Sequence, residues 1–402
     1  MEPKFYRKVL KNGMTVLFEK RDIPVVAVAF AVRNGGINET AEEKGISHFI
    51  EHMLYKGTPT RNAKRIAEEI EKNGGELNGF TSENITAYWC KMPSKHLDVA
   101  LNVLSDMIKN PLFDEKELEK ERKVIFEEIK MYHDNPLMHA FDEIKEVMYE
   151  EPFGMKLAGT IESMSSIDKK KMMQKFKEIY KPSNLVFAVV GDADFSKLCD
   201  FCENNFSKEK GQVPHFAIKL KKGQKTEKRK DIDQASYIFA YHSPLSKDKT
   251  SYAAEVLLAL MAGGMSSRLF TEIREKRNLA YAVKGSMETT KDFSYGQIYV
   301  GTNKENIEKI NELILKEFSE VSKVLDEKEL NSVKEQLIGR YQINMEDSQT
   351  QMVNLLMDEM DGNAEEFYEY EGKIRKVNLE DVKNLAKKVA LGDYSSFALV
   401  PG

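Results

Sequence analysis

Short apolar runs separated by polar turns predict β-strands in the first part of the chain. Residues 14–19 and 24–32 are rich in β-branched and other apolar side chains, with a short polar segment between them. This pattern predicts a hairpin, and the unbroken apolar composition of residues 24–32 predicts that its second strand is buried on both faces. Residues 76–80 and 86–92 have strand-like composition and are joined by a polar turn. We therefore expect four strands in this part of the chain.

Apolar residues at helical spacing predict helices between and after these strands. Gly45 leads into a short amphipathic segment that ends before the Gly-Thr-Pro-Thr sequence at residues 57–60. Residues 62–73 and 97–108 also place their apolar side chains on one face. Strands followed by helices in this order predict an α+β fold.

The predicted helix over residues 114–133 carries two carboxylates beside its apolar face. When the residues are projected at about 100° each, Glu121 and Glu128 lie within about 70° of the centre of that face, whereas Glu127 points to the opposite side. A carboxylate at the edge of a buried surface is costly unless it is paired. The two groups are therefore either partners in salt bridges, for example with Arg122, or part of a metal site.

The second half of the chain repeats the first in outline. Residues 237–241 again predict a strand, a polar loop follows, and a helix is expected over residues 252–261. The chain closes with residues 391–402, which resemble the end of the first half at residues 180–191. This predicts two related α+β domains.

We place the domains at residues 1–215 and 231–402, and only the first carries a candidate metal motif. Residues 216–230 are expected to form a basic linker, in which residues 219–230 are lysine-rich and nearly free of apolar side chains. A basic run of this kind is either a polyanion site or a solvated linker, and the linker is the simpler interpretation.

Composition narrows the classes of partner. The 402 residues include 60 basic and 65 acidic ones, a net charge of -5, which argues against nucleic acid or an anionic membrane as the main partner. The N-terminal residues lack the apolar core of a signal peptide, and no apolar run is long enough to span a bilayer, so we expect a cytoplasmic protein.

Cys199 and Cys202 form a C-x-x-C pair, but a single pair without a second is more typical of helix-packing cysteines than of a zinc or redox site.

The most informative short motif is H-x-x-E-H, formed by His48, Glu51 and His52. On a helix these three side chains share one face, and the opposite face is apolar enough to be buried. Two imidazoles one turn apart can bind one Zn²⁺, and a neighbouring carboxylate can accept a proton from water. The alternative is two surface histidines beside a solvated glutamate. The motif is the signature of the inverzincin peptidases.

Further motifs are spread over the chain, at residues 73–81 (NGGELNGFT), 121–129 (ERKVIFEEI) and 263–270 (GGMSSRLF), the last running on to Tyr281. Together with H-x-x-E-H they resemble the zinc metallopeptidase family that contains pitrilysin, insulin-degrading enzyme and the mitochondrial processing peptidase. The resemblance covers nearly the whole chain and is nearest to the two-domain processing-peptidase type. It implies two domains, each a mainly antiparallel sheet packed against helices, that form half of a clamshell.

The resemblance also implies roles for individual residues. The third zinc ligand of the family lies about 76 residues after the second histidine, which is Glu128, the residue that the helical projection had already favoured over Glu127. Glu121 corresponds to a carboxylate that supports the metal ligands from behind. Glu51 corresponds to the general base, and one Zn²⁺ per chain is implied.

Substrate contacts are implied in both domains. In the first, the substrate peptide is expected to add as a strand near residues 74–80, which include Asn78. In the second, Arg274 and Tyr281 correspond to an arginine and a tyrosine, seven residues apart, that contact the bound peptide.

We therefore expect a zinc-dependent endopeptidase that hydrolyses peptides or unfolded segments. Similar enzymes enclose the substrate with four such domains, so a dimer is implied, with Arg274 and Tyr281 of one chain facing the zinc of the other. A homodimer is self-sufficient, and a heterodimer with a degenerate homologue is the alternative. The competing function is that of a non-catalytic or regulatory partner subunit of a processing peptidase.

Overall fold

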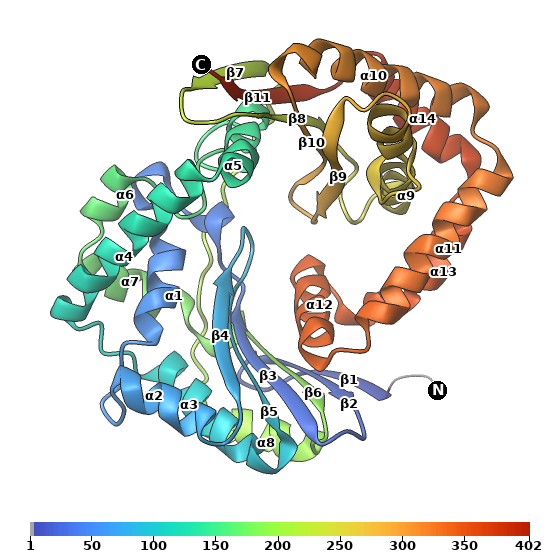
Figure 1. Ribbon diagram of the computed structural model, residues 1–402. Helices are drawn as coiled ribbons and strands as arrows, with labels where there is room; N and C mark the ends of the chain where they lie inside the picture. Colours follow the sequence, from blue (N-terminus) through green and yellow to red (C-terminus); the bar gives the residue numbers. More distant parts are fainter. Residues whose placement is uncertain (1–3) are drawn as a thin grey trace. The chain divides into compact units, whose positions relative to one another are not determined.

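The computed structural model describes residues 4–402, which form two compact units, each organised around one β-sheet. The units are discontinuous in sequence. The first contains residues up to 130 together with residues 156–217 and 344–367, and the second contains the remainder (Figure 1). Among the described residues, no helix is both long and apolar enough to cross a membrane.

The first unit contains six strands and the helices packed on them. The strands are β1 (Lys4–Val9), β2 (Thr15–Lys20), β3 (Val25–Val32), β4 (Glu76–Thr81), β5 (Thr86–Pro93) and β6 (Leu185–Gly191). The helices are α1 (Ile46–Leu54), α2 (Ala63–Glu71), α3 (Leu97–Lys109), α4 (Glu115–Asp134, whose last turn belongs to the second unit), α6 (Ile161–Ser166), α7 (Lys169–Ile179), α8 (Phe195–Asn205) and α12 (Ser348–Asp361).

The second unit contains five strands, again with helices. The strands are β7 (Gln224–Arg229), β8 (Ala235–His242), β9 (Ala280–Thr289), β10 (Ser294–Thr302) and β11 (Ser395–Pro401). The helices are α5 (Pro136–Met148), α9 (Ser251–Ala262), α10 (Ile307–Val324), α11 (Glu327–Asn344), α13 (Tyr370–Lys376) and α14 (Leu379–Ala390).

The order of the first sheet corrects one prediction. Its strands follow the order β1-β2-β6-β3-β5-β4, so β2 and β3 are not a hairpin. Instead β6, from much later in the chain, lies between them, parallel to β2 and antiparallel to β3. Every residue of β6 is buried, and a strand of that composition is most stable at the centre of a sheet, where both edges are hydrogen-bonded. The predicted β4–β5 hairpin is present and antiparallel.

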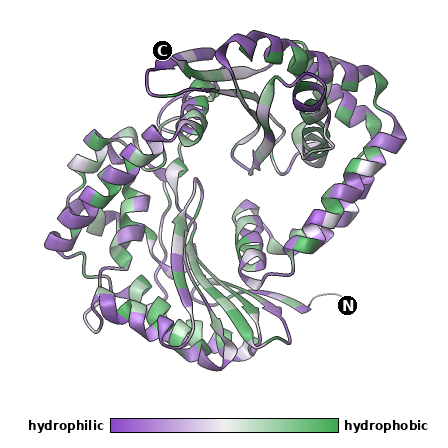
Figure 2. Ribbon diagram, viewed as in Figure 1, coloured by the Kyte–Doolittle hydropathy of each residue, from purple (hydrophilic) through white to green (hydrophobic). Residues whose placement is uncertain are grey.

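Both faces of this sheet are covered, as the apolar composition of residues 24–32 predicted. Val28 and Phe30 of β3 belong to the main apolar core, which also includes residues of α1 and α3. The alternate residues Ala27 and Ala29 point to the other face and are fully buried as well, because α12 packs on β3 and β6. Hydropathy agrees with this burial, because the central strands β3 and β6 are apolar whereas the edge strand β1 is largely polar (Figure 2).

The second sheet repeats the first. Its order is β7-β11-β8-β10-β9, with one parallel pair, β7 and β11, and antiparallel pairs elsewhere. This matches β2-β6-β3-β5-β4 strand for strand, with β11 in the place of β6. The internal repeat predicted from the two similar segments is therefore present, and the fold is α+β with mainly antiparallel sheets.

Two features depart from the predicted division into residues 1–215, 216–230 and 231–402. Helix α5 lies in the first half of the sequence but packs on β8 and β11, and α12 lies in the second half but packs on β3 and β6. One face of each sheet is therefore covered by a helix from the other half of the chain. Sequence periodicity shows that a helix has an apolar face but does not show which sheet that face will contact.

The predicted basic linker also contains a regular element, because residues 224–229 form strand β7. It pairs in parallel with β11 at the edge of the second sheet, and most of its residues are exposed. Edge strands often carry lysines because the charge opposes pairing with other chains. The lysine-rich composition that predicted a linker is thus also typical of an edge strand.

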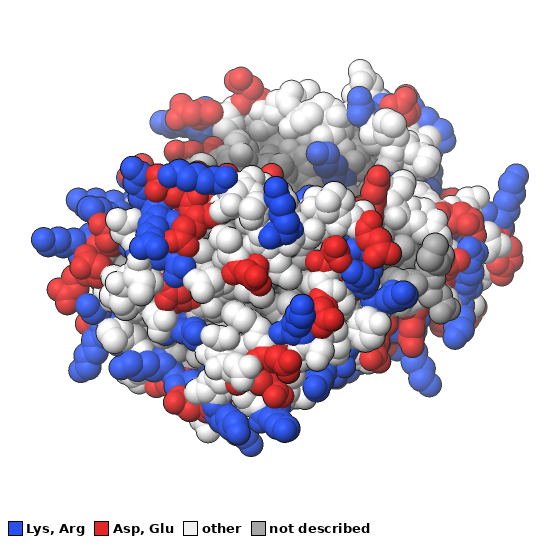
Figure 3. Space-filling model, turned by 90° about the horizontal axis from the view of Figure 1, so that it is seen from below, with Lys and Arg blue, Asp and Glu red and all other residues white. Residues whose placement is uncertain are grey.

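Charged side chains of both signs are interspersed over the face shown in Figure 3. The sequence contains nearly equal numbers of basic and acidic residues, 60 and 65.

Candidate metal centre

The start of helix α1 is held in place by a glycine turn and by hydrogen bonds to a buried carboxylate. Gly45, at its N-cap, has a φ of 93°, a left-handed conformation that favours glycine, and a Cβ there would lie 2.6 Å from the Ala158 carbonyl oxygen. The buried Glu39 carboxylate accepts hydrogen bonds from the backbone N–H groups of Gly45 (3.0 Å) and Ser47 (2.8 Å). These bonds satisfy free donors of the first turn and fix the start of the helix.

The apolar face of α1 is buried as predicted, by the side chains of Ile46, Phe49, Ile50, Met53 and Leu54. The 3.6-residue period then leaves His48, Glu51 and His52 together on the opposite side, each only partly buried. The geometry of the motif is therefore set by the burial of its apolar neighbours.

The structure brings together the three predicted metal ligands. The Nε2 atoms of His48 and His52 are 3.2 Å apart, and the Glu128 Oε2 atom of α4 lies 3.7 Å from the first and 3.6 Å from the second. Glu127 is on the exposed side of α4, with a side-chain exposure of 73%. The helical projection of residues 114–133 therefore selected the correct glutamate for this cluster.

These three donors fit a zinc ion. Zinc takes imidazole nitrogens and carboxylate oxygens, and a tetrahedral ion about 2.0–2.1 Å from each ligand separates the ligands by about 3.3–3.4 Å. The observed sides of 3.2, 3.6 and 3.7 Å form a triangle close to that size. Burial, together with the nearby His52, lowers the pKa of His48 to about 3, so its imidazole is neutral and its lone pair available at neutral pH.

Glu121 lies beside the Nδ1 atom of His52. Its Oε2 atom is 3.2 Å from His52 Nδ1, and its Oε1 atom accepts from Lys56 Nζ at 2.6 Å. A carboxylate on Nδ1 favours the tautomer in which Nδ1 carries the proton and Nε2 is the metal-binding atom. Lys56 in turn places a positive charge beside the largely buried Glu121 carboxylate.

Glu51 is held by a residue that the sequence analysis did not single out. The Thr81 hydroxyl, at the end of β4, donates to Glu51 Oε2 at 2.9 Å. Burial raises the pKa of Glu51, and the Thr81 hydrogen bond opposes that shift. Thr81 closes the NGGELNGFT motif, but only the pairing of β4 in the sheet shows that its side chain reaches Glu51.

Three tyrosines lie on the inner side of Glu51. Tyr55 follows it by one turn at the end of α1, and its buried hydroxyl has no hydrogen-bond partner within the described residues. Its ring is 6.0 Å from that of Tyr88, whose hydroxyl is 2.8 Å from the hydroxyl of Tyr180. Burial raises the pKa of all three, and the Glu51 charge adds to the effect, so the phenols stay protonated at neutral pH.

The predicted substrate residues lie in two places. Asn78 is exposed on β4, the edge strand of the first sheet, where its Oδ1 atom accepts from Gly79 N at 2.8 Å. Arg274 and Tyr281 belong to the second unit, whereas every member of the metal cluster belongs to the first. The Arg274 guanidinium lies over the Phe270 ring at 4.8 Å, and Tyr281, 52% exposed, has its hydroxyl 3.1 Å from that of Tyr299.

A second group of potential metal ligands occurs among the described residues, formed by His139, Glu143 and Glu227 of the second unit. Its carboxylates already have cationic partners, because Lys225 contacts Glu143 and Arg229 Nη2 lies 3.2 Å from Glu227 Oε1. Because the charges in this group are balanced, we interpret it as an ion-pair network.

Cys199 and Cys202, as predicted, are buried free cysteines of α8.

Comparison with known families places this site in context. The family model described as "Insulinase (Peptidase family M16)" matches residues 15–161, and the one described as "Peptidase M16 inactive domain" matches residues 166–337. Together they cover most of the chain. The chain belongs to peptidase family M16. The H-x-x-E-H motif falls within the first match, and residues 166–337 of the second match contain no such motif.

Relatives of this M16 chain are named zinc proteases. An uncharacterized zinc protease of Rickettsia felis is 35% identical over 341 residues, covering 84% of this chain and 83% of that one. The uncharacterized zinc protease YmxG of Bacillus subtilis is 32% identical over 400 residues, 98% of each chain.

Solved structures share the whole fold. A protease from Helicobacter pylori has a TM-score of 0.91 at 22% identity, covering 99% of this chain and all of that one. A putative M16-like peptidase from Alicyclobacillus acidocaldarius has a TM-score of 0.87 at 18% identity, covering 100% of this chain and 99% of that one.

Proposed function

We propose that this M16 chain is a zinc-dependent endopeptidase that hydrolyses peptides or unfolded segments. The observation that carries the proposal is the triangle of His48, His52 and Glu128 donor atoms, with Glu51 on the same face of α1. This arrangement supplies metal ligands and a proton acceptor side by side, which is what metal-assisted hydrolysis of an amide requires.

Each residue of the site has a separate chemical role in this proposal. His48, His52 and Glu128 would hold a zinc ion, which would supply the Lewis acidity needed to acidify water and polarise a carbonyl group. Glu51 accepts the proton of the attacking water and later delivers it to the leaving amine. The Thr81 hydroxyl holds Glu51 in place during both transfers, since it donates to Oε2 and leaves Oε1 free to receive the proton.

The substrate peptide is proposed to bind along β4. This strand lies at the edge of the sheet, so one side of its backbone is not paired with another strand of that sheet. A peptide added there in extended conformation would gain main-chain hydrogen bonds that depend little on its sequence. The exposed Asn78 would then contact the peptide backbone with its amide group.

We further propose that the enzyme acts as a dimer in which Arg274 and Tyr281 of one chain complete the site of the other. Both side chains are partly exposed and able to contact a peptide. Mixing Glu51→Gln chains with Arg274→Ala chains tests this, because one composite site in such a mixture keeps both functional groups. Restored peptidase activity supports action between chains, and its absence with folded, dimeric protein contradicts it.

The activity itself is tested by incubating the purified chain with a peptide library and identifying the cleaved bonds. Cleavage should stop with a chelator, return with added zinc, and be lost in Glu51→Gln. No cleavage by the zinc-loaded homodimer, followed by cleavage after addition of an M16 partner chain, would instead favour a subunit of a heterodimeric peptidase.

A further inference from the structure

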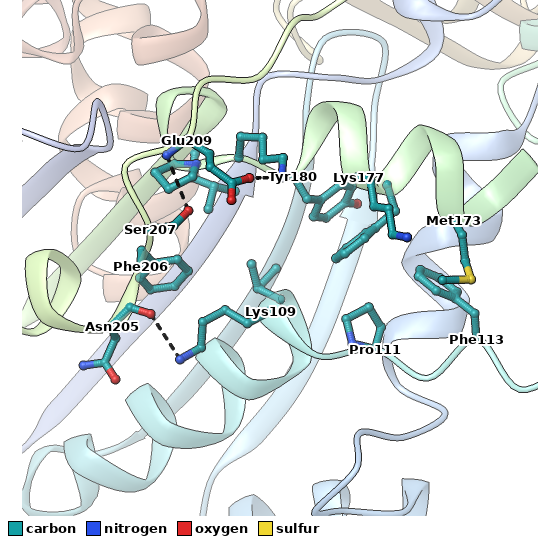
Figure 4. A pocket seen from close by; sticks show the side chains of 15 residues that line it. Lys109, Pro111, Phe113, Met173, Lys177, Tyr180, Asn205, Phe206, Ser207 and Glu209 are labelled. Carbon is teal, nitrogen blue, oxygen red and sulfur yellow. Dashed lines mark hydrogen bonds and ion pairs between the residues drawn. The ribbon is translucent and has the colours of Figure 1, made fainter.

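A cavity of about 470 Å³ opens in the first unit between the ends of α3 and α8 and the helix α7 (Figure 4). Its buried wall is aromatic and aliphatic, and includes Phe113, Phe206 and Leu185, with the partly buried Phe176 beside them. This volume falls within the range of about 300–1,000 Å³ that is usual for small-molecule sites. The metal cluster shares none of these residues.

The rim of the cavity is basic. Lys109, Lys177 and Lys181 line it, against one carboxylate, that of Glu209. Lys181 pairs with Glu209, and Lys109 Nζ donates to the Asn205 carbonyl oxygen at 3.3 Å. Lys177 has no ion-pair partner anywhere in residues 4–402. An apolar wall with an uncompensated ammonium group at its rim is complementary to a molecule that carries one anionic group on an apolar body.

One wall of the cavity continues inward to Glu51. The ring of Tyr180, which lines the cavity, stacks on Phe176 at 4.4 Å, and its hydroxyl is 2.8 Å from that of Tyr88. The Tyr88 ring is 6.0 Å from that of Tyr55, which lies one turn of α1 after Glu51.

Gly79 of β4, directly opposite Tyr88 in the strand pair, marks where this path meets Glu51. A Cβ at Gly79 would be 2.5 Å from the Tyr55 hydroxyl and 3.1 Å from Glu51 Oε1. Those two oxygen atoms therefore approach the same point of β4. A ligand that shifts Tyr180 would act on Glu51 through the hydrogen bond to Tyr88, the neighbouring Tyr55 ring, and the closeness of the Tyr55 hydroxyl to Glu51 at Gly79.

We propose that this cavity binds a small organic acid with an aromatic or branched apolar body, and that binding changes the rate of peptide hydrolysis through Tyr180, Tyr88 and Tyr55. The acid group pairs with Lys177, and the apolar body packs against Phe113 and Phe206. The effect on turnover rests on the proposed peptidase function, whereas binding to the cavity does not.

Binding is tested by calorimetry of the zinc-loaded full-length chain with naphthalene-2-carboxylate and with its neutral amide. The acid should bind about tenfold more tightly than the amide, as expected for one charge-assisted hydrogen bond. Lys177→Met should remove that preference. The matched control is Lys170→Met, an exposed lysine of the same helix that does not line the cavity. Equal affinity for acid and amide, or acid binding unaffected by Lys177→Met, would overturn the site.

Coupling is tested by measuring kcat with and without the acid in the wild type and in Tyr88→Phe, which removes the hydrogen bond to Tyr180. The acid should change kcat in the wild type by at least twofold and leave kcat of Tyr88→Phe unchanged, while it binds both proteins equally. Binding without any change in wild-type kcat overturns the coupling. If the chain cleaves no peptide, the proposed peptidase function fails instead, and calorimetry alone decides whether the cavity is a ligand site.

Discussion

The hydroxyl of Thr81 donates a hydrogen bond to the Glu51 carboxylate over 2.9 Å, and this contact joins the edge strand β4 to helix α1, which carries two of the proposed metal ligands. The same strand is the proposed binding edge for the substrate peptide. The position of Glu51, the proposed proton acceptor, is therefore tied to the element on which the substrate would lie.

We predict that Thr81→Val lowers kcat by about five- to thirtyfold, because losing one hydrogen bond of about 1–2 kcal/mol leaves Glu51 less well oriented. KM and zinc content should be unchanged. Thr81→Ser keeps the hydroxyl and should retain most of the activity. Steady-state kinetics with a cleaved reference peptide make the comparison, and a Thr81→Ser variant as impaired as Thr81→Val would point to packing of the methyl group instead.

Glu51→Gln should reduce kcat by roughly 10²- to 10⁴-fold, the range expected for removal of a general base. The amide has nearly the same shape as the carboxylate, so about one zinc per chain should still be bound. Measuring the zinc content together with kcat shows whether Glu51 acts as a general base or as a metal ligand. Loss of zinc from this variant would make Glu51 a ligand, and Glu128→Gln is the comparison in which metal loss is expected.

Glu121→Gln should weaken zinc affinity by about 10- to 100-fold, because His52 loses the carboxylate that fixes its tautomer and orientation. Competition with a chromogenic chelator measures the change. Glu119, on the same helix and 63% exposed, provides the control, since Glu119→Gln should leave zinc affinity unchanged. An equal effect of both substitutions would indicate a general electrostatic influence of α4.

The buried pair of Glu39 and Lys44 is predicted to stabilise the start of α1. Their charged atoms are 3.8 Å apart, both side chains are fully buried, and the Glu39 carboxylate also accepts hydrogen bonds from the backbone N–H groups of Gly45 and Ser47. Removing one partner leaves a buried charge, so Glu39→Gln should lower the free energy of unfolding by about 3–5 kcal/mol. Urea denaturation of the zinc-free protein tests this, with the exposed Glu42→Gln as the control. A change of less than about 1 kcal/mol would contradict it.

Asp106 is expected to make the free energy of unfolding depend on pH in acid. Its burial would raise its pKa, but hydrogen bonds from Asn110, Thr58, Arg61 and Thr60 outweigh burial and lower the pKa to about 2. A depressed carboxyl pKa stabilises the folded state above the unfolded value of about 3.9, and this contribution is lost as pH falls from about 4 towards 2.

The corresponding measurement compares the wild type with Asp106→Asn across that range. At pH 7 the variant should be less stable by roughly 2 kcal/mol, and the difference should shrink steadily below pH 4. A difference that stays constant from pH 7 to pH 2.5 would show that the hydrogen bonds, and not the charge, account for the effect.

The sequence by itself determined the features that depend on local periodicity. The 3.6-residue period placed His48, Glu51 and His52 on one face of α1, and the same period singled out Glu128 and Glu121 on α4. It also showed that the two halves of the chain are related, because similar strand sequences close each half. These relations hold over one or a few turns, where backbone geometry alone fixes which side chains are neighbours.

Tertiary structure decided everything that depends on the choice of partner. β6 lies between β2 and β3, a lysine-rich segment forms edge strand β7, and α5 and α12 each pack on the sheet of the other half. Thr81 approaches Glu51 only once β4 is paired with β5 beside α1. An apolar face or an unpaired strand edge can be satisfied by several partners of similar composition. The choice among them depends on the packing of the whole chain, which residue spacing does not encode.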